Sequence, residues 1–204
     1  MKRPAVIGIC GRSGSGKSYV CSVFVSFGGY HIDTDAVYHR LLEPADGELS
    51  ECASAIAKKF GDDVVRDGAI DRRRLGAIVF SDKKKLSSLN KIAHKFIKTE
   101  TVRLIRECDS PFVLVDAPLL FESGFNAMCD FTVCVSANEA TCIERICRRD
   151  GITKAEAKRR LSSQIGSLEL KKMCDFSVNN SAGRDVTPDV RKILIKKGLI
   201  KDEI

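Results

Sequence analysis

The segment Gly11-Arg-Ser-Gly-Ser-Gly-Lys-Ser18 places glycines, a lysine and a hydroxyl at a spacing that suits a bound phosphate chain. It matches G-x-x-x-x-G-K-[ST] at every fixed position, and the apolar run at 5–10 before it is typical of a buried strand. The glycines let backbone N–H groups turn toward phosphate oxygens, and a helix beginning near Lys17 directs its positive end at the same anion. We therefore expect a P-loop that binds a nucleoside triphosphate.

Each position of the loop has an expected role. Lys17 is expected to reach the β- and γ-phosphates of ATP and to act in catalysis, and the Ser18 hydroxyl is expected to ligate Mg²⁺. An ordinary Gly/Ser-rich turn is the alternative, which the strand, the spacing and the following helix together disfavour. The expected ATP-binding residues in this segment are Ser13, Gly14, Ser15, Gly16, Lys17 and Ser18.

Carboxylates follow two further expected strands, 30–33 and 111–116. In a parallel α/β sheet, ligands bind beyond the carboxyl ends of the strands, so these groups are expected near the P-loop. We assign Asp35 as the general base that accepts the proton of an attacking hydroxyl, because it is the later residue of Asp33-Thr-Asp35. Asp33 or Asp116 would then hold Mg²⁺ through water. The alternative is that Asp33 and Asp35 are turn residues, with Asp35 capping the next helix.

Two arginines, Arg145 and Arg149, are four residues apart in an expected helix at 137–149 and therefore share one helical face. Guanidinium groups placed in this way suit a lid that neutralises charge on the transferred phosphoryl group. We expect both to bind ATP and Arg145 to act in catalysis. A solvent-exposed basic face is the alternative, because the whole chain is basic.

The elements that must position these residues alternate between strand and helix, which predicts an α/β fold with a five-stranded parallel sheet flanked by helices. Its 204 residues suit one domain. The other expected strands lie at 131–135 and 176–178. A first helix is expected at about 17–27, and further helices at 36–42, 48–60, 71–80, 82–107, 137–149, 153–173 and 186–197.

The net charge of +7, from 34 basic and 27 acidic residues, favours a polyanionic partner. Nucleic acid is disfavoured because aromatic residues make up only 6% of the chain, Trp is absent, and basic residues are not grouped with stacking residues. The lysines at 84, 91, 95 and 98 are interpreted as a solvated helix face. The histidines at 31, 39 and 94 form no metal-ligand or catalytic pattern.

Nine cysteines, an odd number without any Cys-x-x-Cys spacing, indicate free buried thiols in a reducing compartment. The chain has no apolar run of about 18 residues, and its start lacks the features of a signal peptide. These features predict a cytoplasmic protein that does not enter a membrane.

Several further segments carry a family pattern, and they are Ile32-Asp-x-Asp35, Ile70-Asp-Arg72-x-x-Leu75, Leu89-Asn90-x-x-x-His94, Pro118-Leu-Leu-Phe-Glu122, Arg145-x-x-x-Arg149-Asp150 and Gln164. With the P-loop, they make the chain resemble the dephospho-CoA kinase family from Val6 to about Asn180. The P-loop is shared by many NTPases, whereas the 118–122 segment together with the arginine pattern is far more specific. The chain departs from the family pattern at Arg12, Cys142 and Asn179.

The resemblance implies one P-loop kinase domain over 1–204, with a core at about 1–35, 108–136 and 174–204. It also implies a helical acceptor-binding region at about 36–107 and a lid at about 137–173. The implied reaction is Mg²⁺-dependent transfer of a phosphoryl group from ATP to the ribose 3′-hydroxyl of dephospho-CoA, the last step of coenzyme A synthesis. A monomer is favoured. The implied acceptor-binding residues are Asp35, Arg72, His94, Pro118, Leu119, Leu120, Phe121 and Glu122.

Three other functions are possible for such a sequence. A shikimate- or gluconate-type kinase also follows its P-loop with Asp-x-Asp, but the Phe-Arg-x-x-Glu segment of shikimate kinases is absent here. A nucleic-acid-binding NTPase would fit the basic charge alone. A non-catalytic nucleotide sensor is disfavoured because Lys17, Ser18, Asp35 and Arg145 are all present.

Overall fold

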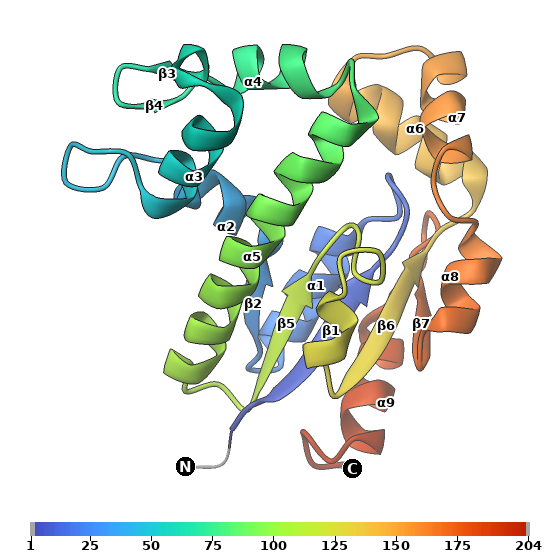
Figure 1. The fold of residues 1–204 in the computed structure, drawn as a ribbon. Coiled ribbons are helices and arrows are strands. Elements are labelled where there is room, and N and C mark those ends of the chain that lie inside the picture. The colour runs from blue at the N-terminus through green and yellow to red at the C-terminus, as the bar shows by residue number, and fades with distance from the viewer. Residues whose placement is uncertain (1–2, 203–204) are drawn as a thin grey trace. The chain divides into compact units, whose positions relative to one another are not determined.

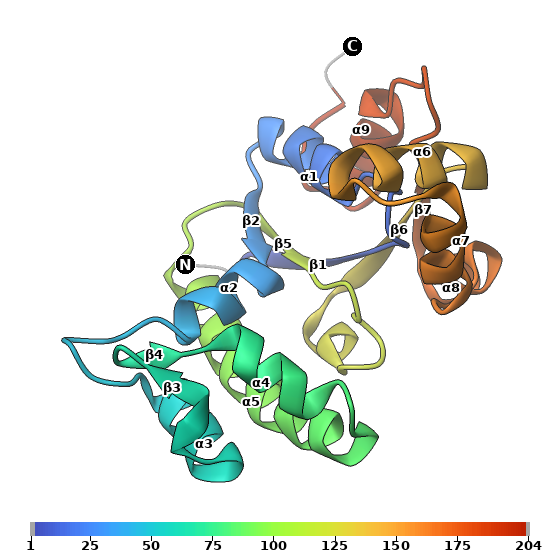
Figure 2. The ribbon, with the colours of Figure 1, turned by 90° about the horizontal axis from the view of Figure 1, so that it is seen from above.

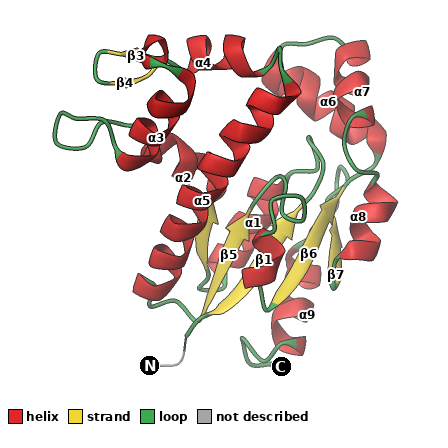
Figure 3. Ribbon diagram, viewed as in Figure 1, coloured by secondary structure: helices red, strands yellow, loops and turns green. Residues whose placement is uncertain are grey.

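The computed structural model describes residues 3–202, which divide into two compact units. The first unit contains the chain up to Ile32 and from Ile105 onward, and the second unit is Asp33–Leu104. In the first unit and at its border with the second, the described residues form a five-stranded parallel sheet with the order β2-β5-β1-β6-β7 (Figure 3). Its strands are β1 (Ala5–Cys10), β2 (Tyr30–Asp33), β5 (Phe112–Asp116), β6 (Phe131–Ser136) and β7 (Phe176–Asn179).

Helices flank this sheet, as the sequence predicts. Helices α1 and α9 lie on one face of the sheet, where Figures 1 and 2 show them side by side. Phe24 of α1 packs edge-on against Phe112 of β5, with ring centroids 6.4 Å apart, inside a core of apolar residues that are almost fully buried. The helices of this unit are α1 (Lys17–Ser26), α6 (Glu139–Asp150), α7 (Lys154–Ser162), α8 (Ser167–Met173) and α9 (Thr187–Lys196), with a 3₁₀ turn η2 (Phe125–Met128).

The helical region expected over 153–173 consists of two helices, because α7 ends at Ser162 and α8 begins at Ser167. The hydroxyls of Ser162 and Ser163 donate to carbonyls three residues earlier, which competes with continuation of the helix. In addition, Gln164 leaves the helical path and bonds to Ser13. A contact with a residue 151 positions away therefore helps to divide a stretch that is helical by its local pattern.

The second unit is mostly helical and has its own apolar core, in which Ile56 and Val64 are fully buried. Ser50 caps α3 through Ala53 N–H, and Asp71 caps α4 through Arg73 and Arg74 N–H. The Asp67-Gly68 turn connects a two-residue hairpin too short to show a strand pattern. Its elements are α2 (Thr34–Leu41), α3 (Glu51–Phe60), η1 (Asp62–Val64), β3 (Val65–Arg66), β4 (Ala69–Ile70), α4 (Arg72–Val79) and most of α5 (Lys83–Glu107).

Within residues 3–202, none of the helices combines the length and the apolar character needed to cross a membrane. The cysteines at 10, 21, 52, 134 and 142 are buried thiols, whereas those at 108, 129, 147 and 174 are half-buried.

Candidate active site

The P-loop connects β1 to α1, and its backbone takes conformations that only glycine adopts readily. Gly14 has φ +75° and Gly16 has φ +81°, both in the left-handed region. Gly11 is required for a different reason, because a Cβ atom there would lie 2.4 Å from the Val135 carbonyl oxygen. The motif glycines therefore serve two needs, the curl of the loop and its close approach to β6.

Two side chains from segments that are distant in sequence donate hydrogen bonds to backbone carbonyls of this loop. The Nη1 group of Arg145 on α6 donates to the carbonyls of Gly14, at 3.3 Å, and Ser15, at 3.2 Å. The buried amide of Asn180 donates to Ser15 O at 2.9 Å. Because N–H and C=O point in opposite directions across a trans peptide, holding the Ser15 carbonyl here directs the Gly16 N–H the other way. These contacts fix an anion-binding orientation before any ligand arrives.

Residues at the end of α7 and just after it form hydrogen bonds with the first residues of the P-loop. Gln164 accepts from Ser13 N–H at 3.0 Å and donates to Ser13 Oγ at 3.1 Å. Arg12 donates to the carbonyl of Leu161, the last buried residue of α7. The family departure at Arg12 is thus a tether between the P-loop and this helix.

Lys17 and Ser18 begin α1, where unpaired N–H groups and the helix dipole favour an anion. Lys17 is half-buried, and its Nζ donates to Gly11 O at 3.5 Å, a long bond that a phosphate could replace. Ser18 is exposed at the first turn.

Asp116 ends β5 beside the root of the P-loop, since it pairs in register with Ile9 of β1. The Asp116 side chain is 8% exposed. Its Oδ2 atom lies 3.5 Å from His31 Nε2 and 3.9 Å from Cys21 Sγ, and the three groups form a cluster. Mg²⁺ prefers oxygen ligands and often keeps part of its water shell, so Ser18 and Asp116 fit this ion. Cys21 and His31 are softer donors that suit Mg²⁺ less well; the Cys21 thiol donates to Oδ2, whereas His31 Nε2 approaches Oδ2 without a hydrogen bond.

Arg149 does not share the contacts of Arg145. It pairs with Asp150 through Nε at 2.7 Å and Nη2 at 2.9 Å, and Asp150 also accepts from Arg160 on α7. The bonds from Arg149 and then Arg160 hold the pKa of the Asp150 carboxyl well below its usual range. In this structure Arg149 thus connects α6 to α7, and its expected role at ATP stays a prediction.

In the second unit, Asp33 rather than Asp35 caps the helix. Its Oδ1 atom accepts from Asp35 N–H at 2.9 Å and Ala36 N–H at 3.2 Å. Asp35 lies in the first turn of α2 with an exposed side chain. The alternative that Asp35 is the cap is therefore wrong, and its role as base stays a prediction.

The other acceptor-side candidates of this unit lie on helices. Arg72 is the first residue of α4 and is exposed. His94 is half-buried on α5, where burial and the nearby Lys98 charge lower its pKa. A neutral imidazole is therefore favoured at neutral pH.

Residues 118–122 form turns directly after β5. Leu120 is buried and its carbonyl accepts from Phe125 and Asn126 N–H, so it anchors the segment. Pro118, Leu119 and Glu122 are exposed, and Phe121 is half-buried. The exposed members are the ones available to a ligand.

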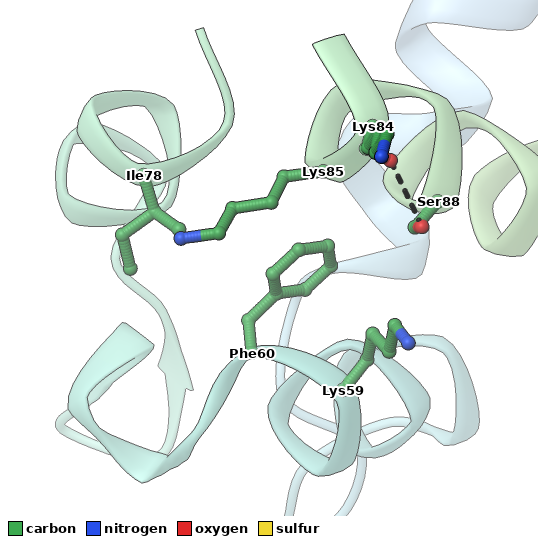
Figure 4. Close-up of a pocket in the computed structure, with 6 residues that line it drawn as sticks. All are labelled: Lys59, Phe60, Ile78, Lys84, Lys85 and Ser88. Atoms are coloured by element: carbon green, nitrogen blue, oxygen red, sulfur yellow. Dashed lines mark hydrogen bonds between the residues drawn. The ribbon is translucent and has the colours of Figure 1, made fainter. Parts of the chain in front are cut away.

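A cavity of about 370 Å³ lies within the second unit. Figure 4 shows Lys85 extending past the Phe60 ring toward Ile78, with Lys59 beside the ring. Lys84, part of the basic face expected on α5, also lines this cavity with Ser88, whose hydroxyl donates to the Lys84 carbonyl at 3.0 Å. Three lysines and an aromatic ring thus line one cavity, and such a lining suits an anionic ligand with an apolar part.

Sequence reasoning assigned no role to Asn180, Gln164, Cys21 or His31. Gln164 could have been found because it belongs to the family pattern. Asn180 could have been found because it is next to Asn179, where the sequence differs from that pattern. No local pattern indicates the contacts that these residues make to the P-loop and to Asp116, because their partners are remote in sequence.

Comparison with known proteins identifies the family. The model of the family described as dephospho-CoA kinase matches residues 5–185. The chain belongs to the dephospho-CoA kinase family. A dephospho-CoA kinase of Anaeromyxobacter dehalogenans is 38% identical over 181 residues, which cover 86% of this chain and 83% of that protein. Membership makes the chain an ATP-dependent kinase of coenzyme A biosynthesis, with dephospho-CoA as acceptor.

Solved structures agree with the dephospho-CoA kinase assignment. A crystal structure from Thermus thermophilus matches with a TM-score of 0.82 and 28% identity, covering 96% of this chain and 98% of that one. The dephospho-CoA kinase from Campylobacter jejuni matches with a TM-score of 0.66 and 26% identity over the same shares. The expected α/β P-loop fold, family and kinase activity are confirmed, in preference to the shikimate-type alternative.

Proposed function

We propose that Lys17 and Arg145 bind the phosphates of ATP while Asp35 activates the ribose 3′-hydroxyl of dephospho-CoA, giving coenzyme A and ADP. The observation that supports this best is that Arg145 and Asn180 both donate hydrogen bonds to the Ser15 carbonyl of the P-loop. These bonds turn the Gly16 N–H the other way, so that it can face a phosphate. Such a loop needs little reorganisation to bind a triphosphate, which is how fixed dipoles lower a reaction barrier.

On the donor side, the N–H groups of Gly16 and Lys17 meet the phosphate oxygens. The Nζ group of Lys17 moves from Gly11 O to the β- and γ-phosphates. Arg145 already uses Nη1 on the loop, and its Nη2 and Nε groups are the donors that meet the phosphoryl group. Arg149 joins them only if it leaves Asp150.

Mg²⁺ is the proposed cofactor, held by the Ser18 hydroxyl and, through water, by Asp116. When bound, it neutralises charge on the β- and γ-phosphates. We favour Asp116 over Asp33 because Oδ1 of Asp33 already accepts two N–H groups as the cap of α2. The Cys21 thiol, which donates to Oδ2 at 3.9 Å, helps to keep the Asp116 carboxylate oriented.

On the acceptor side, Asp35 accepts the proton of the 3′-hydroxyl as its oxygen attacks the γ-phosphorus of ATP. Arg72 is proposed to bind an acceptor phosphate and neutral His94 to donate or accept one hydrogen bond. Exposed residues at 118, 119 and 122, with Phe121, complete the proposed acceptor contacts. The basic residues of the second unit give the pyrophosphate of the acceptor a favourable potential.

We further propose that the protein acts as a cytoplasmic monomer without a nucleic-acid partner. The free thiols of its described part suit a reducing compartment, and this supports the cytoplasmic location.

The experiment is an acceptor screen with the purified protein and Mg-ATP, in which ADP release is measured with a coupled assay. We expect release with dephospho-CoA and none above background with shikimate, gluconate or single-stranded DNA. Phosphorus NMR of the product should show a new 3′-phosphomonoester. ADP release with another acceptor but not with dephospho-CoA would contradict the assignment.

A further inference from the structure

Three cysteines from separate elements of the first unit meet at the root of the P-loop. Cys10 is the last residue of β1 and directly precedes Gly11, and Cys174 directly follows α8. Their sulfur atoms are 3.3 Å apart. A disulfide bond has a length of about 2.05 Å, so the two sulfurs would need to approach by only about 1.3 Å.

The third thiol, Cys134, is the register partner of Cys10 on β6. Hydrogen bonds from Cys10 and then Cys174 lower the pKa of Cys134, and the charge of Lys171 acts in the same direction. A thiolate is thus favoured inside the cluster, next to two thiols that can donate to it. The hydrogen bond with Cys10 lowers the pKa of Cys174, but the bond with Cys134 and burial outweigh it and raise this pKa to about 11. Hydrogen bonds with Cys134 and then Cys174 raise the pKa of Cys10. Cys134 is therefore the base of the cluster, which takes a thiol proton from its neighbours when they react.

Exposure differs among the three cysteines. Cys10 and Cys134 are each 1% exposed, whereas Cys174 is half-buried. A small oxidant therefore reaches Cys174 first. Asp175 fixes the position of Cys174, because its Oδ2 atom accepts from Thr132 N–H at 2.8 Å and from Thr132 Oγ1 at 2.9 Å.

We propose that Cys10 and Cys174 form a peroxide-sensitive disulfide site that weakens ATP binding when the bond is closed. The sulfur of Cys174 attacks one oxygen of hydrogen peroxide, and its thiol proton leaves with hydroxide as water, which gives a sulfenic acid. The sulfur of Cys10 then attacks that of Cys174, the Cys10 thiol proton passes to the Cys134 thiolate, and Cys134 passes this proton on to the displaced hydroxide, which leaves as water. Two thiols and one peroxide thus give one disulfide and two waters, and a dithiol reverses the change.

The effect on ATP rests on the proposed function and on the crowding next to Cys10. Gly11 is already so close to β6 that a Cβ atom would lie 2.4 Å from Val135 O and 2.8 Å from Ser15 Oγ. A displacement of Cys10 toward Cys174 is therefore transmitted into the loop instead of being absorbed there.

The test compares the full-length protein with Cys174→Ser and with Cys108→Ser, a matched control at another half-buried cysteine of the same unit. After peroxide and alkylation, free thiols are counted in denaturant and peptides are mapped by mass spectrometry. We expect the wild type to fall from nine thiols by two, with one linked Cys10–Cys174 peptide pair. Cys108→Ser should form the same pair and Cys174→Ser none. Cys174→Ala is a second variant should the serine protein not fold.

Equilibrium dialysis with Mg-ATP measures the consequence. We expect the oxidised wild type to bind ATP roughly fivefold more weakly, with recovery after dithiothreitol. A missing Cys10–Cys174 pair, or the same loss of affinity in Cys174→Ser, overturns the proposal. A linked pair with unchanged affinity overturns its effect on ATP. Failure of the reduced wild type to bind ATP would instead contradict the proposed function, because peptide mapping does not depend on it.

Discussion

The proposed nucleotide side and the proposed acceptor side of this kinase are built in different ways. The P-loop is fixed by side chains remote in sequence, since Arg145 and Asn180 reach its carbonyls from α6 and from the end of β7. In the second unit, Asp33 and Asp71 organise the helix starts through bonds to residues two and three positions away. The donor site is thus preorganised by tertiary contacts, whereas the acceptor-side residues are oriented locally.

This difference predicts separable effects of substitution. A change at a P-loop tether should lower both nucleotide affinity and stability, because the tether is part of the packed fold. A change at Asp35 or Arg72 should alter turnover or acceptor binding with little effect on ATP or on folding.

The largest expected effect is at Asp35. Asp35→Asn keeps the size of the side chain but removes the base, so kcat should fall by about 10² to 10⁴. The matched control is Asp33→Asn, because asparagine caps a helix about as well as aspartate. We expect this control to keep kcat within about threefold, and coupled ADP release with dephospho-CoA measures both. A comparable fall in Asp33→Asn would place Asp33 at the metal.

The next effect is at Arg145. Arg145→Gln removes the charge and the bonds to Gly14 and Ser15, and a lost hydrogen bond to a charged group is worth about 1.5–3 kcal/mol. We expect kcat/KM for ATP to fall by about 10- to 100-fold. Arg148→Gln, at an exposed position on the same helix, is the control and should change little. Equal losses in the two variants would show that only the overall charge matters.

A smaller effect is expected at Asn180. Asn180→Ala leaves the Ser15 carbonyl without its shortest bond, which should lower the free energy of unfolding by about 1–3 kcal/mol. Urea denaturation measures this change. Ser177→Ala, at an exposed position of β7, should cost about 0.5 kcal/mol. If both variants lose the same stability, the tether to the P-loop is not the cause.

The smallest effect concerns pH. The N–H and then the hydroxyl of Thr132 lower the pKa of Asp175 in the folded protein. The stability from these bonds is therefore present above about pH 4, the usual value of an unfolded aspartate, and is lost as the pH falls through the folded-state pKa. Solvent weakens the interaction, so Asp175→Asn should cost about 1 kcal/mol at pH 7.

Denaturant unfolding at several pH values checks the sign of this effect. The difference between wild type and Asp175→Asn should narrow below about pH 4. The control is Asp202→Asn, at an exposed ion pair with Arg191, which should show a difference near zero throughout. A difference that grows with acid would contradict the direction of the pKa shift.

The same contrast explains what the sequence could predict. The P-loop, its strand and its helix were predictable because the motif is contiguous and because Gly14 and Gly16 meet a local need for left-handed backbone. The strands of the sheet followed from apolar runs such as 112–116. The cap of α2 was not predicted, because the alternative interpretation placed it at Asp35 whereas the structure places it at Asp33, whose extended backbone precedes the helix.

Contacts between residues that are remote in sequence limited what the sequence could predict. The break between α7 and α8 depends on Gln164 reaching Ser13, and the Cys10–Cys174 contact joins residues 164 positions apart. Neither has a signal in the surrounding residues. The odd number of cysteines, without Cys-x-x-Cys spacing, favoured free thiols, and the thiols are indeed unbridged. Their convergence beside the P-loop is visible only in the folded chain.

The separation of the two sides is tested most directly by the affinity for Mg-ATP of two variants, measured by isothermal titration calorimetry without acceptor. We expect Asp35→Asn to bind within about twofold of the wild type and Arg145→Gln to bind at least about tenfold more weakly. Equal weakening in both variants, or wild-type affinity in Arg145→Gln, would contradict the account.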